Sequence, residues 1–144
     1  MTSSGLMGVS AGSSAISTVG QADVGLTYRG YSITDLAAES TFEEVSYLLI
    51  YGKLPGQKQL GAYKKKLAGL RSLPDSLKTL LEAMPASTHP MDVLRTGTSL
   101  LGTLEAEGED GRTAASVGDR LTASFGSMLA YWYRFHSRDE RIET

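Results

Sequence analysis

At 144 residues the chain has the length of one domain, and its 41% hydrophobic and 21% charged residues are typical of a folded globular protein. Its 14 Lys and Arg against 16 Asp and Glu give a net charge of -2. That balance excludes the excess of positive charge with which proteins neutralise nucleic-acid phosphates. The absence of cysteine excludes disulfides, thiolate chemistry and cysteine-based zinc sites. We expect a cytoplasmic protein that does not bind nucleic acid.

The apolar runs of the chain are short. Tyr47–Tyr51 is one of the longest, far below the ~20 residues that cross a bilayer. Residues 1–14 are rich in Ser and Gly and lack the basic region and apolar core of a signal peptide. We therefore expect a flexible lead-in over 1–14 and no membrane contact. The basic run Lys64–Lys66 is typical of a solvated helix face.

The strand signals are confined to residues 15–31. Ala15–Val19 is short and β-branched, and Leu26–Tyr31 alternates between apolar and polar residues. The Gly-bounded segment Gly20–Gly25 between them has turn chemistry. Two such runs around a Gly-containing loop predict a β-hairpin over 15–31.

Helical patterns begin after Ser32. Thr34 can cap a short helix that ends near Glu39, and Thr41–Glu44 matches a capping box. Gly52 fits the left-handed position after that second helix. Pro55 suits the first turn of the next helix. The apolar stripe of that helix follows spacings of three and four: Leu60, Tyr63, Leu67 and Leu70.

Three further helices follow. Pro74 and Pro90 each open one, and the last spans about 113–136 after a charged loop over 105–112. In the Pro90 helix, Gly97 allows close helix contact. The residues expected to face inward are Leu77, Leu80, Leu81, Met84, Val93, Leu94, Leu100, Leu101, Leu104, Val117, Leu121, Phe125, Met128, Leu129 and Trp132. The predicted fold is mainly helical, all-α in class: a short amino-terminal hairpin, then residues 32–144 as the helical part of a single, truncated domain.

Catalytic patterns are absent. The two histidines, His89 and His136, fall on different predicted helices without a second ligand three or four residues away, so we expect no metal site and no cofactor. Adjacent carboxylates such as Glu43 and Glu44 diverge by about 100° on a helix and do not converge on one substrate atom.

Two candidate binding residues lie near Pro90. His89 precedes it and is therefore extended, at the start of a helix. It either caps that helix or contacts a ligand at the positive helix end. Arg95 follows in the same helix and either pairs with a carboxylate or binds substrate.

Three blocks carry a resemblance to a known family. They are Gly25-Leu-Thr-Tyr-Arg-Gly-Tyr-Ser-Ile33, Phe42-Glu-Glu-Val-Ser-Tyr-Leu-Leu-Ile-Tyr-Gly-Lys-Leu-Pro55 and His89-Pro-Met-Asp-Val-Leu-Arg-Thr-Gly97. In this order they resemble the amino-terminal third of the citrate synthase family. The lead-in from Gly5 and the segment Leu129–Tyr133 are most similar to bacterial 2-methylcitrate synthases of propionate breakdown.

The resemblance implies an almost all-helical homodimer, with the chain forming the amino-terminal part of the large domain. It implies condensation of an acyl-CoA with oxaloacetate, the CoA thioester being a substrate and no cofactor being required. In that chemistry an Asp takes a proton from the acyl carbon and two His stabilise the developing charges. Their motifs, His-Gly-Gly and Gly-His-x-x-Tyr, are absent from this sequence.

We therefore expect a piece of a 2-methylcitrate synthase that is inactive by itself, with no catalytic residue. Lys66, His89 and Arg95 are the candidate substrate or CoA contacts, Lys66 near the CoA entrance. Two alternatives stay open: a citrate synthase that uses acetyl-CoA, and a non-catalytic helical module that interacts with or regulates a synthase. The fragment should self-associate through its 113–136 helix, because helices without their partners expose apolar faces.

Overall fold

The computed structural model describes residues 12–18 and 25–144. These residues group into two compact units, Met1–Pro55 and Gly56–Thr144. Residues 1–11 of the expected lead-in, and 19–24 of the expected hairpin loop, lie outside the described residues. The division of the chain into a lead-in, a hairpin and one helical domain stays a prediction.

The first unit contains a small antiparallel sheet with strand order β1-β2-β3. The strands are β1 (Ser17–Thr18), β2 (Thr27–Tyr28) and β3 (Tyr31–Ser32). The pairing of β1 with β2 confirms the predicted hairpin, with Ser17 opposite Tyr28. The third strand was not expected from the sequence, because two residues are too short to show an alternating pattern.

Arg29 and Gly30 form the two-residue turn between β2 and β3. Both have positive φ, 51° and 87°, as a type I′ hairpin turn requires. Arginine is an unusual residue in this conformation, and its side chain supplies the compensating contacts. One Nη donates to the Leu49 carbonyl at 2.8 Å and the other to the Ala15 carbonyl at 3.3 Å.

Two helices complete this unit, α1 (Ile33–Glu39) and α2 (Phe42–Tyr51). The capping box of α2 is confirmed, because Thr41 N–H donates to Glu44 Oε2 at 2.8 Å and Glu44 N–H returns to Thr41 Oγ1. Gly52 ends α2 in the left-handed conformation, as predicted. The cap of α1 was predicted wrongly: Ser32 holds the N-cap position, and Thr34 lies inside the first turn.

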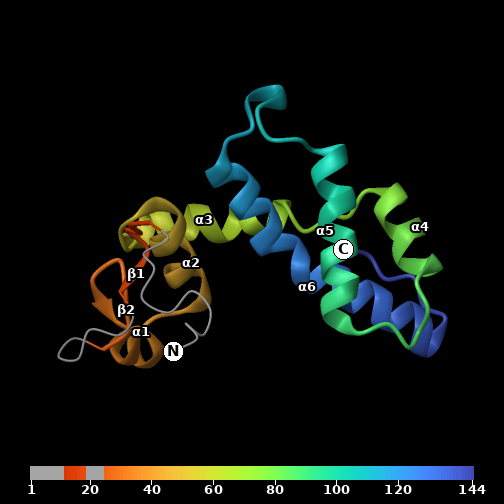
Figure 1. The fold of residues 1–144 in the computed structure, drawn as a ribbon, viewed down its shortest axis with the longest axis horizontal. Helices are drawn as coiled ribbons and strands as arrows, with labels where there is room; N and C mark the ends of the chain where they lie inside the picture. Colours follow the sequence, from red (N-terminus) through yellow and green to blue (C-terminus); the bar gives the residue numbers. More distant parts are fainter. Residues whose placement is uncertain (1–11, 19–24) are drawn as a thin grey trace, which may run out of the picture. The chain divides into compact units, whose positions relative to one another are not determined.

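The second unit contains four α-helices (Figure 1). They are α3 (Gln57–Gly69), α4 (Asp75–Ala83), α5 (Pro90–Leu104) and α6 (Ala114–Arg138), with a short 3₁₀ turn, η1 (Glu109–Gly111), before α6. Helix α6 contacts each of the other three. Pro55 was expected in the first turn of α3 but precedes it, because Gly56 holds the N-cap and donates its N–H to Gln59 Oε1 at 3.0 Å.

The core of this unit lies where α4, α5 and α6 meet. Leu77, Leu81, Val93 and Met128 are fully buried there, as predicted. Leu104 and Phe125 were expected inside but are 44% and 37% exposed. Leu104 is the last residue of α5, and Phe125 lies one position off the buried face of α6, where Ser124 is buried instead. That serine needs no outside partner, because its hydroxyl donates to the Arg120 carbonyl.

Gly97 permits the close approach of α5 to α6. A Cβ atom at this position would stand 3.1 Å from Met128 Sδ and 3.6 Å from Leu77 Cδ1. The sequence expectation of a close helix contact at this glycine is confirmed.

We predict that Gly97→Val lowers the free energy of unfolding by about 1–3 kcal/mol, because the added methyl groups overpack the core. Gly61→Val is the matched control in α3, where an added Cβ meets nothing within 4 Å. It should stay within about 0.5 kcal/mol of the parent. Urea unfolding followed by the fluorescence of the single tryptophan, Trp132, measures both. Equal stabilities of the two variants would contradict the close contact.

Candidate functional site

A buried carboxylate joins α6 to α3. Asp119 has an exposed fraction of 0% although it is an ionisable residue, near the start of α6. It accepts a hydrogen bond from Tyr63 Oη at 2.9 Å and pairs with Lys66 Nζ at 2.5 Å. Tyr63 and Lys66 are three residues apart on α3 and therefore share one face of that helix.

The next residue of α6 forms a second ion pair. The Arg120 guanidinium donates to both oxygens of Glu105 at 2.9 Å and also to the Leu70 carbonyl. This hydrogen bonding holds the pKa of the Glu105 carboxyl below its ordinary value, while burial acts in the opposite direction. Arg120 thus fixes the carboxyl end of α3 and the carboxyl end of α5 to the start of α6.

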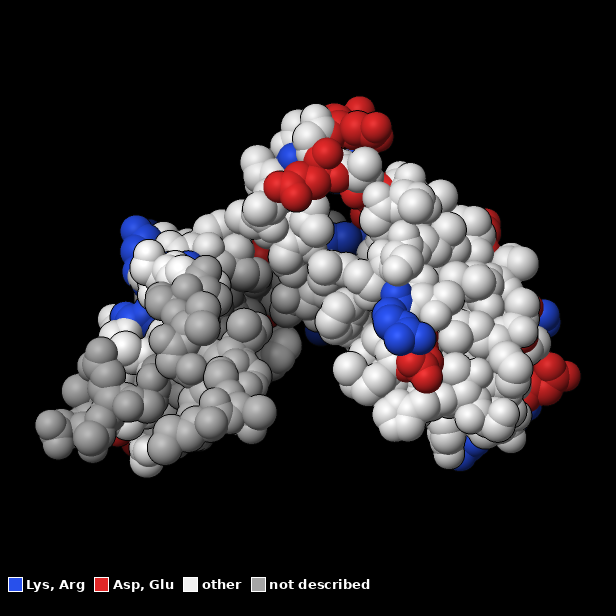
Figure 2. Space-filling model, viewed as in Figure 1, with Lys and Arg blue, Asp and Glu red and all other residues white. Residues whose placement is uncertain are grey.

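A pocket of about 430 Å³ lies beside these two ion pairs. Its wall is mostly apolar and includes Leu70, Leu101 and Leu121, while Lys66, Arg112 and Arg120 supply its cations. Each cation has a carboxylate partner: Asp119 for Lys66, Asp110 for Arg112 and Glu105 for Arg120. Acidic side chains gather at the connection from α5 to α6 (Figure 2). The pocket is therefore an apolar hollow whose positive charges are already balanced.

The three candidate binding residues do not come together. Lys66 lines the pocket, with 45% of its side chain exposed. His89 is the N-cap of α5, where its Nδ1 accepts from the Met91 N–H at 3.2 Å. Arg95 pairs with Asp92 one turn earlier on the exposed face of α5, at 3.1 Å. Their roles in substrate or CoA binding stay predictions.

Among the described residues that line the pocket, Glu105 is the one carboxylate, and it is paired with Arg120. Over residues 12–18 and 25–144, no group of three or more His, Asp or Glu side chains stands close enough to hold a metal ion. No helix in this part of the chain is long and apolar enough to cross a membrane. Asp119, Tyr63 and the Arg120–Glu105 pair were missed from the sequence. The sequence signal that could have indicated them is the adjacent pair Asp119 and Arg120 within an otherwise apolar helical pattern.

Comparison with known proteins identifies the family. A family model described as "Citrate synthase, C-terminal domain" matches residues 5–144. The chain belongs to the citrate synthase family. This confirms the resemblance stated above, and the mainly helical class is confirmed as well.

The similarity extends over the whole chain but over a minor part of each relative. A 2-methylcitrate synthase of Shewanella oneidensis is 55% identical over 144 residues, which is 100% of this chain and 38% of that protein. A citrate synthase of Synechocystis is 33% identical over 141 residues and is covered to 36%. The crystal structure of citrate synthase from Thermotoga maritima matches 97% of this chain and 36% of that one, with a TM-score of 0.79 and 34% identity.

We predict that Asp119→Ala lowers the free energy of unfolding by about 3 kcal/mol, since it removes two hydrogen bonds to a charged group, from Tyr63 Oη and Lys66 Nζ, each worth about 1.5–3 kcal/mol. The value lies at the low end because Lys66 is 45% exposed. Asp92→Ala, which removes the exposed pair with Arg95, should cost less than about 1 kcal/mol. Chemical unfolding measures both, and similar losses would contradict the importance of Asp119.

The lowered pKa of Glu105 predicts a contribution to acid stability. The group stabilises the fold above its ordinary pKa of 4.5, and this stabilisation is lost as the pH falls through the lower folded-state value. Glu105→Gln should therefore lose less stability than the parent between pH 7 and pH 3, these two values being chosen to bracket the carboxyl range. Glu107→Gln, on the same loop, is the control. Parallel pH profiles for parent and Glu105→Gln would rule the contribution out.

Proposed function

We propose that this chain is the amino-terminal part of a 2-methylcitrate synthase, an acyltransferase that converts propionyl-CoA, oxaloacetate and water to 2-methylcitrate and CoA. The observation that carries the proposal is the 55% identity with the Shewanella enzyme over every residue of the chain. Two further 2-methylcitrate synthases, of Corynebacterium glutamicum, are 41% and 39% identical over 128 and 140 residues. A place in propionate breakdown belongs to the same proposal.

The chain would supply framework and not catalysis. His89 caps α5, and His136 Nε2 lies 3.2 Å from the Leu81 carbonyl, so both imidazoles are engaged in structure. The His-Gly-Gly and Gly-His-x-x-Tyr motifs of the family are absent from the sequence. Both observations support the expectation that these residues do not turn over substrate alone.

Lys66 has the strongest support among the candidate CoA contacts. Its ammonium stands at a pocket and is held in place by Asp119. His89 and Arg95 are exposed and are not among the residues that line that pocket. We retain them as proposed substrate contacts of a longer enzyme.

Self-association and a cytoplasmic location are part of the proposal. Helices α5 and α6 carry exposed apolar side chains, Met91 at 64% and Tyr133 at 61%. Phe125, Leu129 and Tyr133 follow at spacings of four along α6, which forms one stripe. Such a stripe supports the expected homodimer through α6, because soluble monomers expose few contiguous apolar patches.

Use of acetyl-CoA in place of propionyl-CoA is the second candidate. A citrate synthase of Mycolicibacterium smegmatis is 44% identical over 110 residues, close to the values for the Corynebacterium enzymes. The two candidate functions are distinguished by the kinetics of the complete enzyme with propionyl-CoA and with acetyl-CoA.

We predict that the 144-residue chain releases no CoA from propionyl-CoA and oxaloacetate above the rate without protein. Free thiol production measures this. The coding sequence read beyond Thr144 should encode a His-Gly-Gly motif, and the product of the full reading frame should show a higher kcat/KM with propionyl-CoA than with acetyl-CoA.

Three outcomes would contradict parts of this proposal. Turnover by the chain alone would contradict its inactivity. A higher kcat/KM with acetyl-CoA would favour citrate synthase. A stop codon after Thr144, together with co-purification of a second chain that carries the missing motifs, would favour the non-catalytic interaction module.

A further inference from the structure

The last six residues, 139–144, turn back from α6 and are called the strap below. Asp139 ends the helix in the left-handed conformation, with φ at 54°, and donates its N–H to the Phe135 carbonyl at 2.9 Å. Glu140 then pairs with Arg134 Nε at 3.1 Å. The reversal brings the following residues onto α4.

Glu82 of α4 is the acceptor that holds the strap. The Arg141 guanidinium donates Nε to Oε1 and Nη2 to Oε2, both at 2.8 Å. Tyr131 Oη of α6 donates to the same Oε1 at 2.7 Å. One carboxylate therefore receives three hydrogen bonds, from two residues that lie 49 and 59 positions further along the chain. A two-bond contact between arginine and carboxylate also fixes the orientation of the strap.

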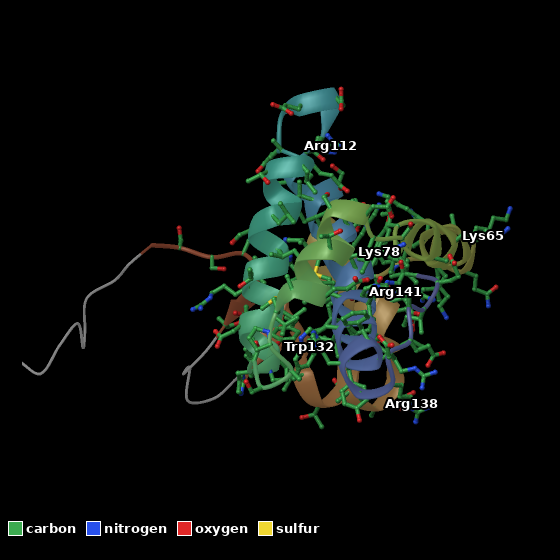
Figure 3. All side chains as sticks on the ribbon, turned by 90° about the vertical axis from the view of Figure 1, so that its right-hand side faces the viewer. Lys65, Lys78, Arg112, Trp132, Arg138 and Arg141 are labelled. Carbon is green, nitrogen blue, oxygen red and sulfur yellow. The ribbon has the colours of Figure 1, made fainter. Side chains whose placement is uncertain are left out.

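The strap continues along α4 toward its beginning. Ile142 packs against the buried core, and Thr144 Oγ1 accepts from the Leu73 N–H at 3.1 Å, just before α4 starts. With α4 and Tyr131 the strap lines an open pocket of about 380 Å³. In Figure 3 Arg141 and Lys78 lie on the same side of the helices, and both residues line this pocket.

The titratable and charged groups around Glu82 come from the strap, α6 and α4. Arg141 lies on the strap, Tyr131 and His136 on α6, and Lys78 and Asp75 on α4, while Glu143 of the strap lines the same pocket. The hydrogen bond from Arg141, followed by that from Tyr131, holds the pKa of Glu82 below its ordinary value of 4.5. Burial raises the pKa of Tyr131, and its hydrogen bond to Glu82 adds to the rise.

The strap has few contacts compared with the core beneath it. Most of its residues are exposed, and Ile142 is its one large apolar side chain. Leu77, Leu81 and Met128 below it are fully buried and pack on one another through helices that do not involve the strap. Segments with little buried apolar surface open at a lower free energy than the core of the same protein.

We propose that the strap is an acid-sensitive latch: ionised Glu82 holds residues 139–144 against α4, and loss of that charge releases them while α4, α5 and α6 stay packed. When the strap is released, Tyr131 becomes more accessible to solvent. The Leu73 amide then loses its hydrogen bond to Thr144 Oγ1. Because docking lowers the pKa of Glu82, the latch is fully stabilised above pH 4.5 and loses this stabilisation as the pH falls through the lower docked-state value.

Trypsin tests the latch, because Arg138 and Arg141 are cleavage sites at and in the strap. At one neutral pH, Glu82→Gln should raise the rate of cleavage after Arg138 by about tenfold, as charged hydrogen bonds to the strap are weakened. Glu143→Gln, on the strap itself, should leave the rate within about twofold of the parent. Equal rates for the parent and Glu82→Gln would overturn the proposal.

Hydrogen exchange separates local release from general destabilisation. In Glu82→Gln the Leu73 amide should exchange about tenfold faster, while amides of α5 and central α6 keep the parent rates. Parent protein brought to pH 4 from pH 7, a step chosen to begin protonating a carboxyl with a lowered pKa, should show the same selective change after correction for intrinsic exchange. A uniform acceleration of all core amides would show that Glu82 supports the whole unit, and would overturn the latch.

Discussion

The buried carboxylate of Asp119 is the constraint on which the second unit depends. A charge without water contact is costly unless it is paired and hydrogen-bonded. Tyr63 and Lys66 can satisfy Asp119 only if one face of α3 lies against the amino-terminal part of α6. The pairing therefore fixes the register of two helices through residues that are 56 and 53 positions apart in the chain. Apolar packing alone tolerates other registers far more readily.

Arg120 extends this constraint to α5. Consecutive residues on a helix point about 100° apart, so Asp119 and Arg120 reach different neighbours. Arg120 binds Glu105, just after α5, and the carbonyl of Leu70, just after α3. With these ends fixed, α5 crosses α6 at Gly97, where an added Cβ atom would stand 3.1 Å from Met128 Sδ and would force that side chain to shift. The pocket beside the ion pairs is the space that remains between the three fixed ends.

Local features of this fold were predictable from the sequence, and the long-range ones were not. The capping box at Thr41 and the left-handed Gly52 involve neighbours within four residues, so their patterns are visible in the chain. The burial of Asp119 depends on its hydrogen bond with Tyr63, which lies 56 residues away in the chain. The periodicity of the sequence around Asp119 does not indicate this contact. Phe125 shows the same limit of sequence-based prediction. Its hydrophobicity predicts a buried side chain, but in the structure Phe125 is exposed and the neighbouring Ser124 is buried. The sequence led to Lys66 as a candidate CoA contact, but it did not reveal that Asp119 is the ion-pair partner of this lysine.

The ion pair with Asp119 limits how Lys66 could bind a phosphate group. Displacing the ammonium from Asp119 would leave a fully buried carboxylate with a reduced set of partners, which is costly. An ammonium carries three donors, however, and the Lys66 side chain is 45% exposed. A phosphate can thus approach from the solvent side while the contact with Asp119 persists. Asp119 would then orient the lysine and partly neutralise it, so any anion bound at this pocket draws its affinity from the apolar wall as well as from charge.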